Sequence, residues 1–331
     1  MNLSTVSTVS GPVLTGDLGR VLMHEHLSSL LPGAYLSGGE GDDTFDLGVR
    51  ATSTLRSQGV CGLVSLSGHY MPASAWDVVA RIAEATGLHV IAGFGYYTER
   101  RWPEEVRTWS LDQLVETFVS AAEAIPGTNV PAGIYGEIGT SLDLITDGEE
   151  RQLKAVAEAH RITGLPIYTH CSLGTMVAEQ VDILAEAGAD LEQVILGHVD
   201  LRPDADGLEP LLRSGVTLAF DTFGKQNFDY VLREEENYEP GNELKRLYTR
   251  RDDDRADALA ELVRRGWARQ LVISLDMTGR ETYLNVDTHG RFGYSYFADG
   301  VLPMLRQRGV TDEQVEVMTR ENPARLLTVR T

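Results

Sequence analysis

The hydrophobic and polar positions of this chain form eight short apolar runs, which alternate with stretches of helical spacing. A continuous apolar run is typical of a strand buried on both faces, and apolar residues three or four apart are typical of an amphipathic helix. Strands that alternate with helices predict a parallel sheet joined by crossover helices. The predicted strands are residues 21–27, 59–66, 88–92, 132–139, 165–170, 194–198, 216–221 and 271–276.

Eight such units predict an α/β fold in which the sheet closes into a (β/α)8 TIM barrel, and residues 1–331 are expected to form one domain. An open doubly wound sheet shares the alternation, but the sequence has no Gly-x-Gly-x-x-Gly fingerprint. Pro323 is expected to end the last helix. The main predicted helices are residues 76–86, 111–124, 149–163, 175–187, 208–214, 257–265, 303–308 and 312–320.

Composition narrows the class of protein. The net charge is −20 with a pI near 4.8, and no basic stripe suited to nucleic acid is present. No segment has the apolar length of a membrane span, and residues 1–15 do not resemble a signal peptide. Cys61 and Cys171 are too few for a disulfide framework. A soluble cytoplasmic protein is expected, with the acidic blocks 234–236 and 252–254 on its surface.

Polar residues with ligand chemistry follow the apolar runs. His-x-His alone is a weak signal, because most such pairs are structural, but further candidates end four later runs. In a barrel these strand ends meet at one mouth, where they would leave buried polar groups unpaired unless cations bind. Imidazole and carboxylate suit zinc, with manganese, cobalt or iron as alternatives. The sequence therefore predicts two divalent ions held by His24, His26, Glu137, His170, His198 and Asp276.

The motifs that carry these residues resemble the phosphotriesterase family of the amidohydrolase superfamily. The resemblance covers nearly the whole chain, in order. It rests on residues 23–27, 132–141, 168–170, 197–200, 220–225, 274–276 and 321–325.

The resemblance implies a role for each predicted ligand. His24, His26 and Asp276 would hold the more buried ion, and His170 with His198 the more exposed one. Glu137 would bridge the two ions, at a position where the phosphotriester-hydrolysing and lactonase branches carry a carboxylated lysine. A glutamate bridge is similar instead to the phosphotriesterase homology proteins and the phosphotriesterase-related proteins of animals.

This branch implies hydrolysis of a small amide, ester or lactone, including N-acylated amino compounds, by attack of a hydroxide held between the ions. Asp276 would accept its proton. Phosphotriesterase or lactonase activity is the alternative, as is a metal-binding barrel with little catalysis. An aldolase would need a lysine at a strand end, and none of the eight runs ends in one. The resemblance also implies a homodimer.

Substrate contacts are predicted in the loops that follow the strands. Tyr97 would orient substrate or simply pack at the barrel rim. Lys225 and Arg280 would pair with a substrate carboxylate or sulfonate. Asp221 would hold a ligand histidine or have a structural role. Residues 227–254 are expected to form a lid or a partner-facing surface.

The remaining histidines and Cys171 are not assigned to the metal site. Histidines in loops are most often plain surface residues, and those in strands or helices are explained by packing. Cys171 should point away from His170 along the strand and be buried and inert. The unassigned histidines are His69, His89, His160 and His289.

Overall fold

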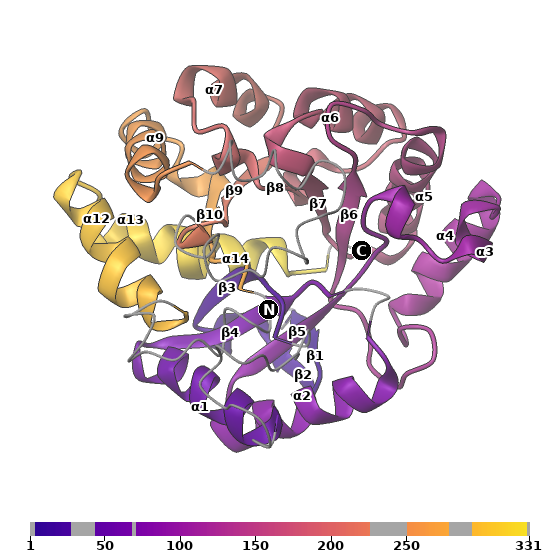
Figure 1. Ribbon diagram of the computed structural model, residues 1–331, viewed down its shortest axis with the longest axis horizontal. Coiled ribbons are helices and arrows are strands. Elements are labelled where there is room, and N and C mark those ends of the chain that lie inside the picture. Colours follow the sequence, from indigo (N-terminus) through magenta and orange to yellow (C-terminus); the bar gives the residue numbers. More distant parts are fainter. Residues whose placement is uncertain (1–3, 28–43, 68–70, 226–249, 278–292, 330–331) are drawn as a thin grey trace, which may run out of the picture.

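Eight parallel strands form one sheet, in chain order from β3 to β10, and curve into a nearly closed barrel (Figure 1). This computed structural model describes residues 4–27, 44–67, 71–225, 250–277 and 293–329. The predicted (β/α)8 barrel is confirmed, with all eight strands at the predicted places. They are β3 (Arg20–Glu25), β4 (Val60–Ser65), β5 (His89–Phe94), β6 (Ile134–Thr140), β7 (Ile167–Cys171), β8 (Val194–Gly197), β9 (Thr217–Phe220) and β10 (Leu271–Ile273).

Helices surround the strands in Figure 1. Their ends follow local chemistry: Thr146 and Glu149 form a capping box at the start of α5, and Gly164 ends it with a φ of 73°. The helices are α1 (Thr44–Ser57), α2 (Ala73–Thr86), α3 (Glu104–Arg107), α4 (Leu111–Ala121), α5 (Asp147–Thr163), α6 (Val177–Glu186), α7 (Ala205–Arg213), α9 (Asp252–Arg264), α12 (Leu302–Gln307), α13 (Asp312–Glu316) and α14 (Asn322–Leu326).

Two buried layers hold the barrel together. Side chains such as Val64, Ile134 and Val272 fill its interior. The outer layer, between strands and helices, includes the fully buried Trp76 and Phe118. Apolar side chains fill the interior of the barrel, and the site residues lie at the C-terminal ends of its strands.

An N-terminal hairpin that the sequence did not reveal covers the opposite end of the barrel. Strands β1 (Thr5–Thr8) and β2 (Gly11–Leu14) pair antiparallel, and Val9 N donates to Val90 O near the start of β5. Val6 joins the interior cluster together with Leu326 of α14. The hairpin and α14 therefore close the N-terminal end of the strands and leave the C-terminal end for the site.

Helix α9 begins five residues earlier than predicted, at Asp252. The expectation of a solvated acidic block is wrong for this residue, although Asp253 and Asp254 are exposed. Asp252 is buried because its carboxylate accepts from Gly224 N, the Tyr296 hydroxyl and Arg255 Nη1. Negative charge also suits the first turn of a helix.

Pro323 does not end the last helix, contrary to the prediction. A π-helical turn, Val317–Glu321, follows α13, and Pro323 lies in the first turn of α14 directly after it. Proline fits a first turn because its missing N–H would have no partner within the helix there.

Several predictions fall outside the described residues. Arg280, His69, His289, the acidic block 234–236 and residues 227–249 of the expected lid at 227–254 lie there. The homodimer and the cytoplasmic location stay predictions. Every helix in the described ranges is too short or too polar to cross a membrane.

Candidate metal centre

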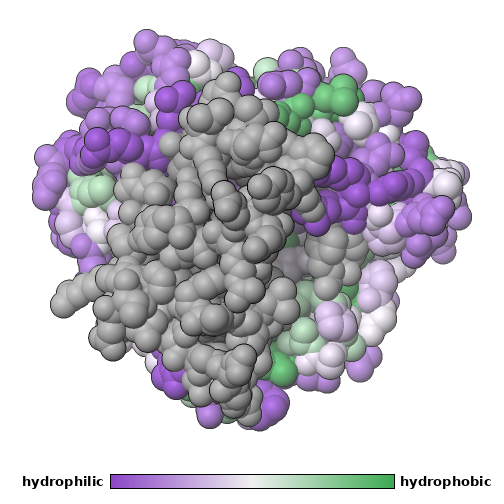
Figure 2. All heavy atoms as spheres, in the orientation of Figure 1, coloured by the Kyte–Doolittle hydropathy of each residue, from purple (hydrophilic) through white to green (hydrophobic). Residues whose placement is uncertain are grey.

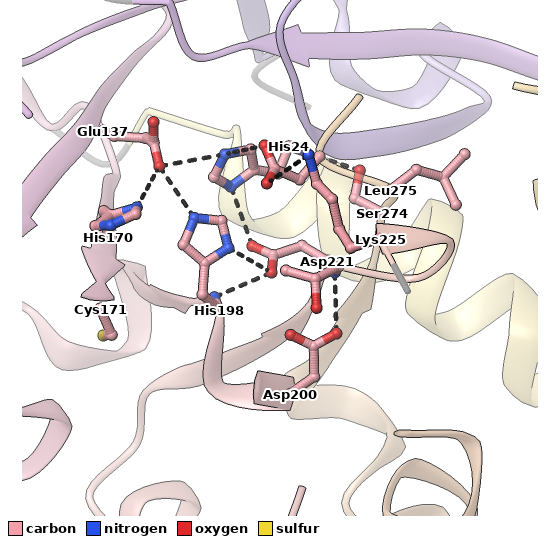
Figure 3. Close-up of polar contacts among 12 residues, drawn as sticks. His24, Glu137, His170, Cys171, His198, Asp200, Asp221, Lys225, Ser274 and Leu275 are labelled. Atoms are coloured by element: carbon pink, nitrogen blue, oxygen red, sulfur yellow. Dashed lines mark hydrogen bonds and ion pairs between the residues drawn. The ribbon is translucent and has the colours of Figure 1, made fainter. Parts of the chain in front are cut away.

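Glu137 is the central carboxylate of the cluster at the barrel mouth. Its Oε1 atom accepts from His170 Nδ1 at 2.8 Å and lies 3.2 Å from His198 Nε2 and 3.4 Å from His24 Nε2. Its Oε2 atom lies 3.7 Å from His26 Nε2. Figure 3 shows three histidines pointing at this carboxylate from different strands. Glu137 therefore faces all four predicted histidine ligands.

A second group of ligand atoms lies beside it. Asp276 Oδ1 is 3.0 Å from His26 Nε2 and 3.5 Å from His24 Nε2. The Nε2 atoms of these two histidines are 3.3 Å apart. The structure thus forms the two predicted trios, in each of which the ligand atoms lie within 4.8 Å of one another: His24, His26, Asp276 and Glu137, His170, His198.

The backbone departs from regular strand geometry at four of these six residues. The register of β3 against β4 shifts between Leu22 and Glu25, and that of β6 against β7 shifts between Tyr135 and Ile138. These shifts fall where His24 and Glu137 turn toward the mouth, which is a common use of bulges near active sites. His198 and Asp276 have φ angles of 60° and 50°. This left-handed backbone is sparsely populated by residues other than glycine, so both positions need support from their surroundings.

Asp221, which directly follows β9, contacts two of the predicted histidine ligands. Its Oδ1 accepts from both the backbone N and Nδ1 of His198 at 3.0 Å. Its Oδ2 accepts from the Tyr168 hydroxyl at 2.8 Å and lies 3.0 Å from His24 Nδ1, without the alignment of a hydrogen bond. The ligand-holding role is therefore the one that the geometry favours for Asp221. One carboxylate contacts a histidine of each trio.

Burial and charge oppose one another in the cluster. Burial disfavours the anion of Glu137, but His170 and His24 hold the pKa of its carboxyl well below the usual range. Burial likewise disfavours the imidazolium of His24, but Glu137 and Asp221 raise its pKa to about 10. His198 has its pKa raised well above the ordinary value despite burial, chiefly by Asp221. The buried carboxylates of the cluster are thus stabilised as anions only by positive charge beside them.

The donor set fits two divalent cations. The Nε2 atoms of His24 and His26 lie 3.3 Å apart, and they can share a hydrogen bond only if one of them carries a proton, whereas a cation could be bound by both. Histidine nitrogen with carboxylate oxygen suits zinc and similar first-row metals. The two trios would each hold one ion, with Glu137 facing both.

Lys225 and Tyr97 border the cluster. Lys225 Nζ lies 3.2 Å from Asp276 Oδ2, so it contacts a candidate ligand. The Tyr97 ring lies edge-on to His170, with ring centroids 4.3 Å apart. Both residues are partly exposed. Their contact with substrate stays a prediction.

The loop that carries Lys225 is fixed by a buried polar network. Thr222 N donates to Asp200 Oδ2 at 2.9 Å, and Arg255 Nε donates to the Thr222 hydroxyl at 2.9 Å. Gly224 N donates to Asp252. Asp200 and Arg255 are fully buried. No sequence pattern connects these distant residues, because only the fold brings them together.

Sequence reasoning missed Glu25 and Ser274. Glu25 is fully buried and accepts from the Ser274 hydroxyl at 2.7 Å, from Leu275 N at 3.0 Å and from Met277 N at 2.9 Å. Burial raises the pKa of Glu25 to about 8, against these three donors. One sequence feature could have pointed to Glu25: it is a charged residue between two predicted ligands at the end of an apolar run.

The unassigned residues in the described ranges behave as expected. His160 is buried, with its Nδ1 2.7 Å from Leu165 O and its Nε2 accepting from Asp190 N. Cys171 is fully buried beside Gln180, and burial raises the pKa of its thiol to about 12. His89, at the start of β5, is half-buried.

The fold and site have known counterparts. A family model described as the phosphotriesterase family matches residues 4–327. The phosphotriesterase homology protein of Escherichia coli (strain K12) is 33% identical, over 92% of this chain and 97% of that protein. The N-acetyltaurine hydrolase of Salmo salar is 28% identical, over 98% of both chains.

One solved structure agrees with these matches. The crystal structure of the phosphotriesterase homology protein from Escherichia coli, complexed with phosphate in its active site, has a TM-score of 0.78 and 32% sequence identity. It covers 94% of this chain and 99% of its own. Fold and sequence therefore place this chain beside the same relative.

Proposed function

Since the chain belongs to the phosphotriesterase family, a family of hydrolytic enzymes, we propose that it hydrolyses a small amide, an N-acylated amino compound, with two divalent metal ions at the barrel mouth. Zinc is the first choice of metal, because imidazole and carboxylate are its ordinary protein ligands besides thiolate. The single observation that supports this proposal is the position of Glu137, whose carboxylate faces four histidines carried by three other strands, β3, β7 and β8.

The ligand set divides the work among the side chains. Two bound divalent ions supply Lewis-acid polarisation and an activated water in hydrolases of this kind. Asp276 directs Oδ1 to His26 and His24 and Oδ2 to Lys225. It is therefore the carboxylate best placed to accept a proton at the mouth and return it to the leaving amine. Asp221 keeps His24 and His198 oriented.

Two residues at the edge of the cluster would select the substrate. The Lys225 ammonium is partly exposed at the mouth and would attract an acidic group on the amine portion, such as a carboxylate or sulfonate. Tyr97, against His170, would limit the acyl portion to a small group. The similarity to N-acetyltaurine hydrolases supports this class, because the substrate in that name is a small acetamide.

The proposal is tested by turnover on a matched panel. Protein loaded with zinc or manganese is assayed on N-acetyltaurine, N-acetyl amino acids, lactones, aryl esters and a phosphotriester, with D276N as the inactive control. We expect the highest kcat/KM on an N-acetyl amide. Turnover confined to lactones or phosphotriesters would assign the other substrate class. A metal-loaded protein inert on the whole panel would contradict the hydrolytic role.

A further inference from the structure

The two trios differ in how their strands are joined. Glu137 and His170 lie in β6 and β7, and His198 follows β8; these neighbouring strands pair parallel with one another, with one register shift between Tyr135 and Ile138. The other trio has His24 and His26 on the β3 side and Asp276 on the β10 side. Strands β3 and β10 are the two ends of the sheet. One metal site is therefore built within the sheet, and the other is built across the seam where the barrel closes.

Individual hydrogen bonds close this seam at the mouth. His24 N donates to the Ser274 hydroxyl at 2.9 Å, Asp276 N donates to His24 O at 3.1 Å, and His26 N donates to Met277 O at 2.9 Å. Each of these bonds involves a predicted ligand or its direct neighbour. The distance between the His24–His26 pair and Asp276 thus depends on the seam.

The Glu25 side chain adds three further hydrogen bonds across the seam. Its carboxylate accepts from Leu275 N and Met277 N, the amides on either side of Asp276, and from the Ser274 hydroxyl. These amides flank a residue whose φ is 50°, a conformation that costs free energy unless the neighbours fix it.

We propose that Glu25 is the positioning residue of the seam metal site: it fixes the left-handed turn at Asp276 so that this carboxylate meets His24 and His26. The inference rests on the metal centre proposed above. It assigns to the middle residue of the His24-Glu25-His26 segment a function of its own. Glu25 does not contact the ions or the substrate, and it acts through Asp276.

The consequence is selective. Loss of Glu25 should loosen the seam site and leave the other site intact. The Glu25 carboxylate accepts from Ser274, Leu275 and Met277, whereas the other site lies on β6, β7 and β8, which pair with one another. Substitution of a residue that supports a metal ligand typically costs about 10- to 100-fold in metal affinity. A purely structural role would instead weaken both sites together.

Glu149 provides a matched control. It is also a fully buried carboxylate near the mouth, and it accepts from Ser141 N, Thr146 N and Glu99 N. These donors belong to the segments that follow β5 and β6. E149Q therefore replaces a comparable buried carboxyl group without touching the seam.

The experiment measures the two metal affinities of the full chain with cobalt(II), by chelator competition and visible absorption. E25Q places an amide group where two amide donors and a hydroxyl converge. It is expected to bind one cobalt ion as wild type does and the other about 10- to 100-fold more weakly. The singly loaded E25Q should have the absorption spectrum of H26A, which lacks a seam ligand, and not that of H198A. E149Q should retain the wild-type ratio of affinities.

Other outcomes overturn the inference. Wild-type affinities in E25Q would remove the positioning role, and equal weakening of both sites would reduce Glu25 to a structural residue. If E25Q does not fold, E25D decides, because it keeps the carboxyl group but withdraws it from the Leu275 and Met277 amides, and it must show a smaller loss at the same site. A wild-type chain that binds no cobalt would refute the metal centre itself, whereas two ions bound equally by wild type and E25Q would refute only the role of Glu25.

Discussion

Lys225 Nζ lies 3.2 Å from Asp276 Oδ2, on the side of that carboxylate opposite His26. Burial disfavours the anion of Asp276, but Lys225 and the neighbouring histidines hold the pKa of its carboxyl far below the usual range. Lys225 thus lies where it can act both on a catalytic carboxylate and on an acidic substrate.

Removal of this ammonium should impair turnover without loss of metal. A hydrogen bond to a charged group contributes about 1.5–3 kcal/mol, so K225M is expected to lower kcat/KM on an N-acetyl amide about 10- to 100-fold. K225R keeps the charge and should recover part of it. Kinetics and metal analysis of both variants check this. Wild-type kcat/KM in K225M, or loss of an ion, would contradict it.

Asp276 should be indispensable for the proton transfer. In D276N the amide cannot accept a proton as the carboxylate does, and a positioned acid or base contributes about 10²- to 10⁴-fold. We expect kcat to fall by at least that factor at saturating metal. Single-turnover kinetics with measured metal occupancy provide the test. A D276N protein with near-normal kcat would exclude the proton role.

Asp221 should couple the two metal sites, because it contacts His198 and His24. D221N should therefore weaken both ions, each by about 10- to 100-fold. Y168F removes only the hydroxyl that donates to Asp221 Oδ2, so its effect on metal affinity should be much smaller. Calorimetric titration with zinc compares the variants. Loss of a single ion in D221N would show that the contact with one of the two histidines has no consequence.

Metal binding should stabilise the fold, since the ligands follow strands from both ends of the sheet. A cation present at about 100 times its Kd adds about 2.7 kcal/mol to the free energy of unfolding. A chelator should therefore lower the Tm, and zinc should restore it. Differential scanning fluorimetry measures both. A Tm indifferent to chelator and zinc would argue against a bound ion.

The sequence was informative about the barrel and the cluster for a simple reason. Buried parallel strands leave continuous apolar runs, and residues that end such runs meet at one mouth. His24, Glu137, His170 and His198 all lie at the ends of such runs, so they are expected to meet whatever the exact geometry. An error of one or two residues in a strand boundary does not change this expectation.

What the sequence could not provide depends on long-range contacts. The register shifts at His24 and Glu137 and the left-handed turn at Asp276 have no local signature. The burial of Asp252 depends on partners at Gly224 and Tyr296, which only the fold brings close. From the local sequence alone, a charged residue is predicted to be exposed, because the distant partners that allow its burial are not known.

The most direct test of the shared carboxylate is the metal content of the wild-type chain and of E137Q, each purified, reconstituted with excess zinc and freed of unbound metal. We predict two ions per chain for wild type and a loss of at least one in E137Q, because the Glu137 carboxylate faces histidines of both trios. Wild-type stoichiometry in E137Q, or a wild-type chain that retains no zinc, would contradict the proposed centre.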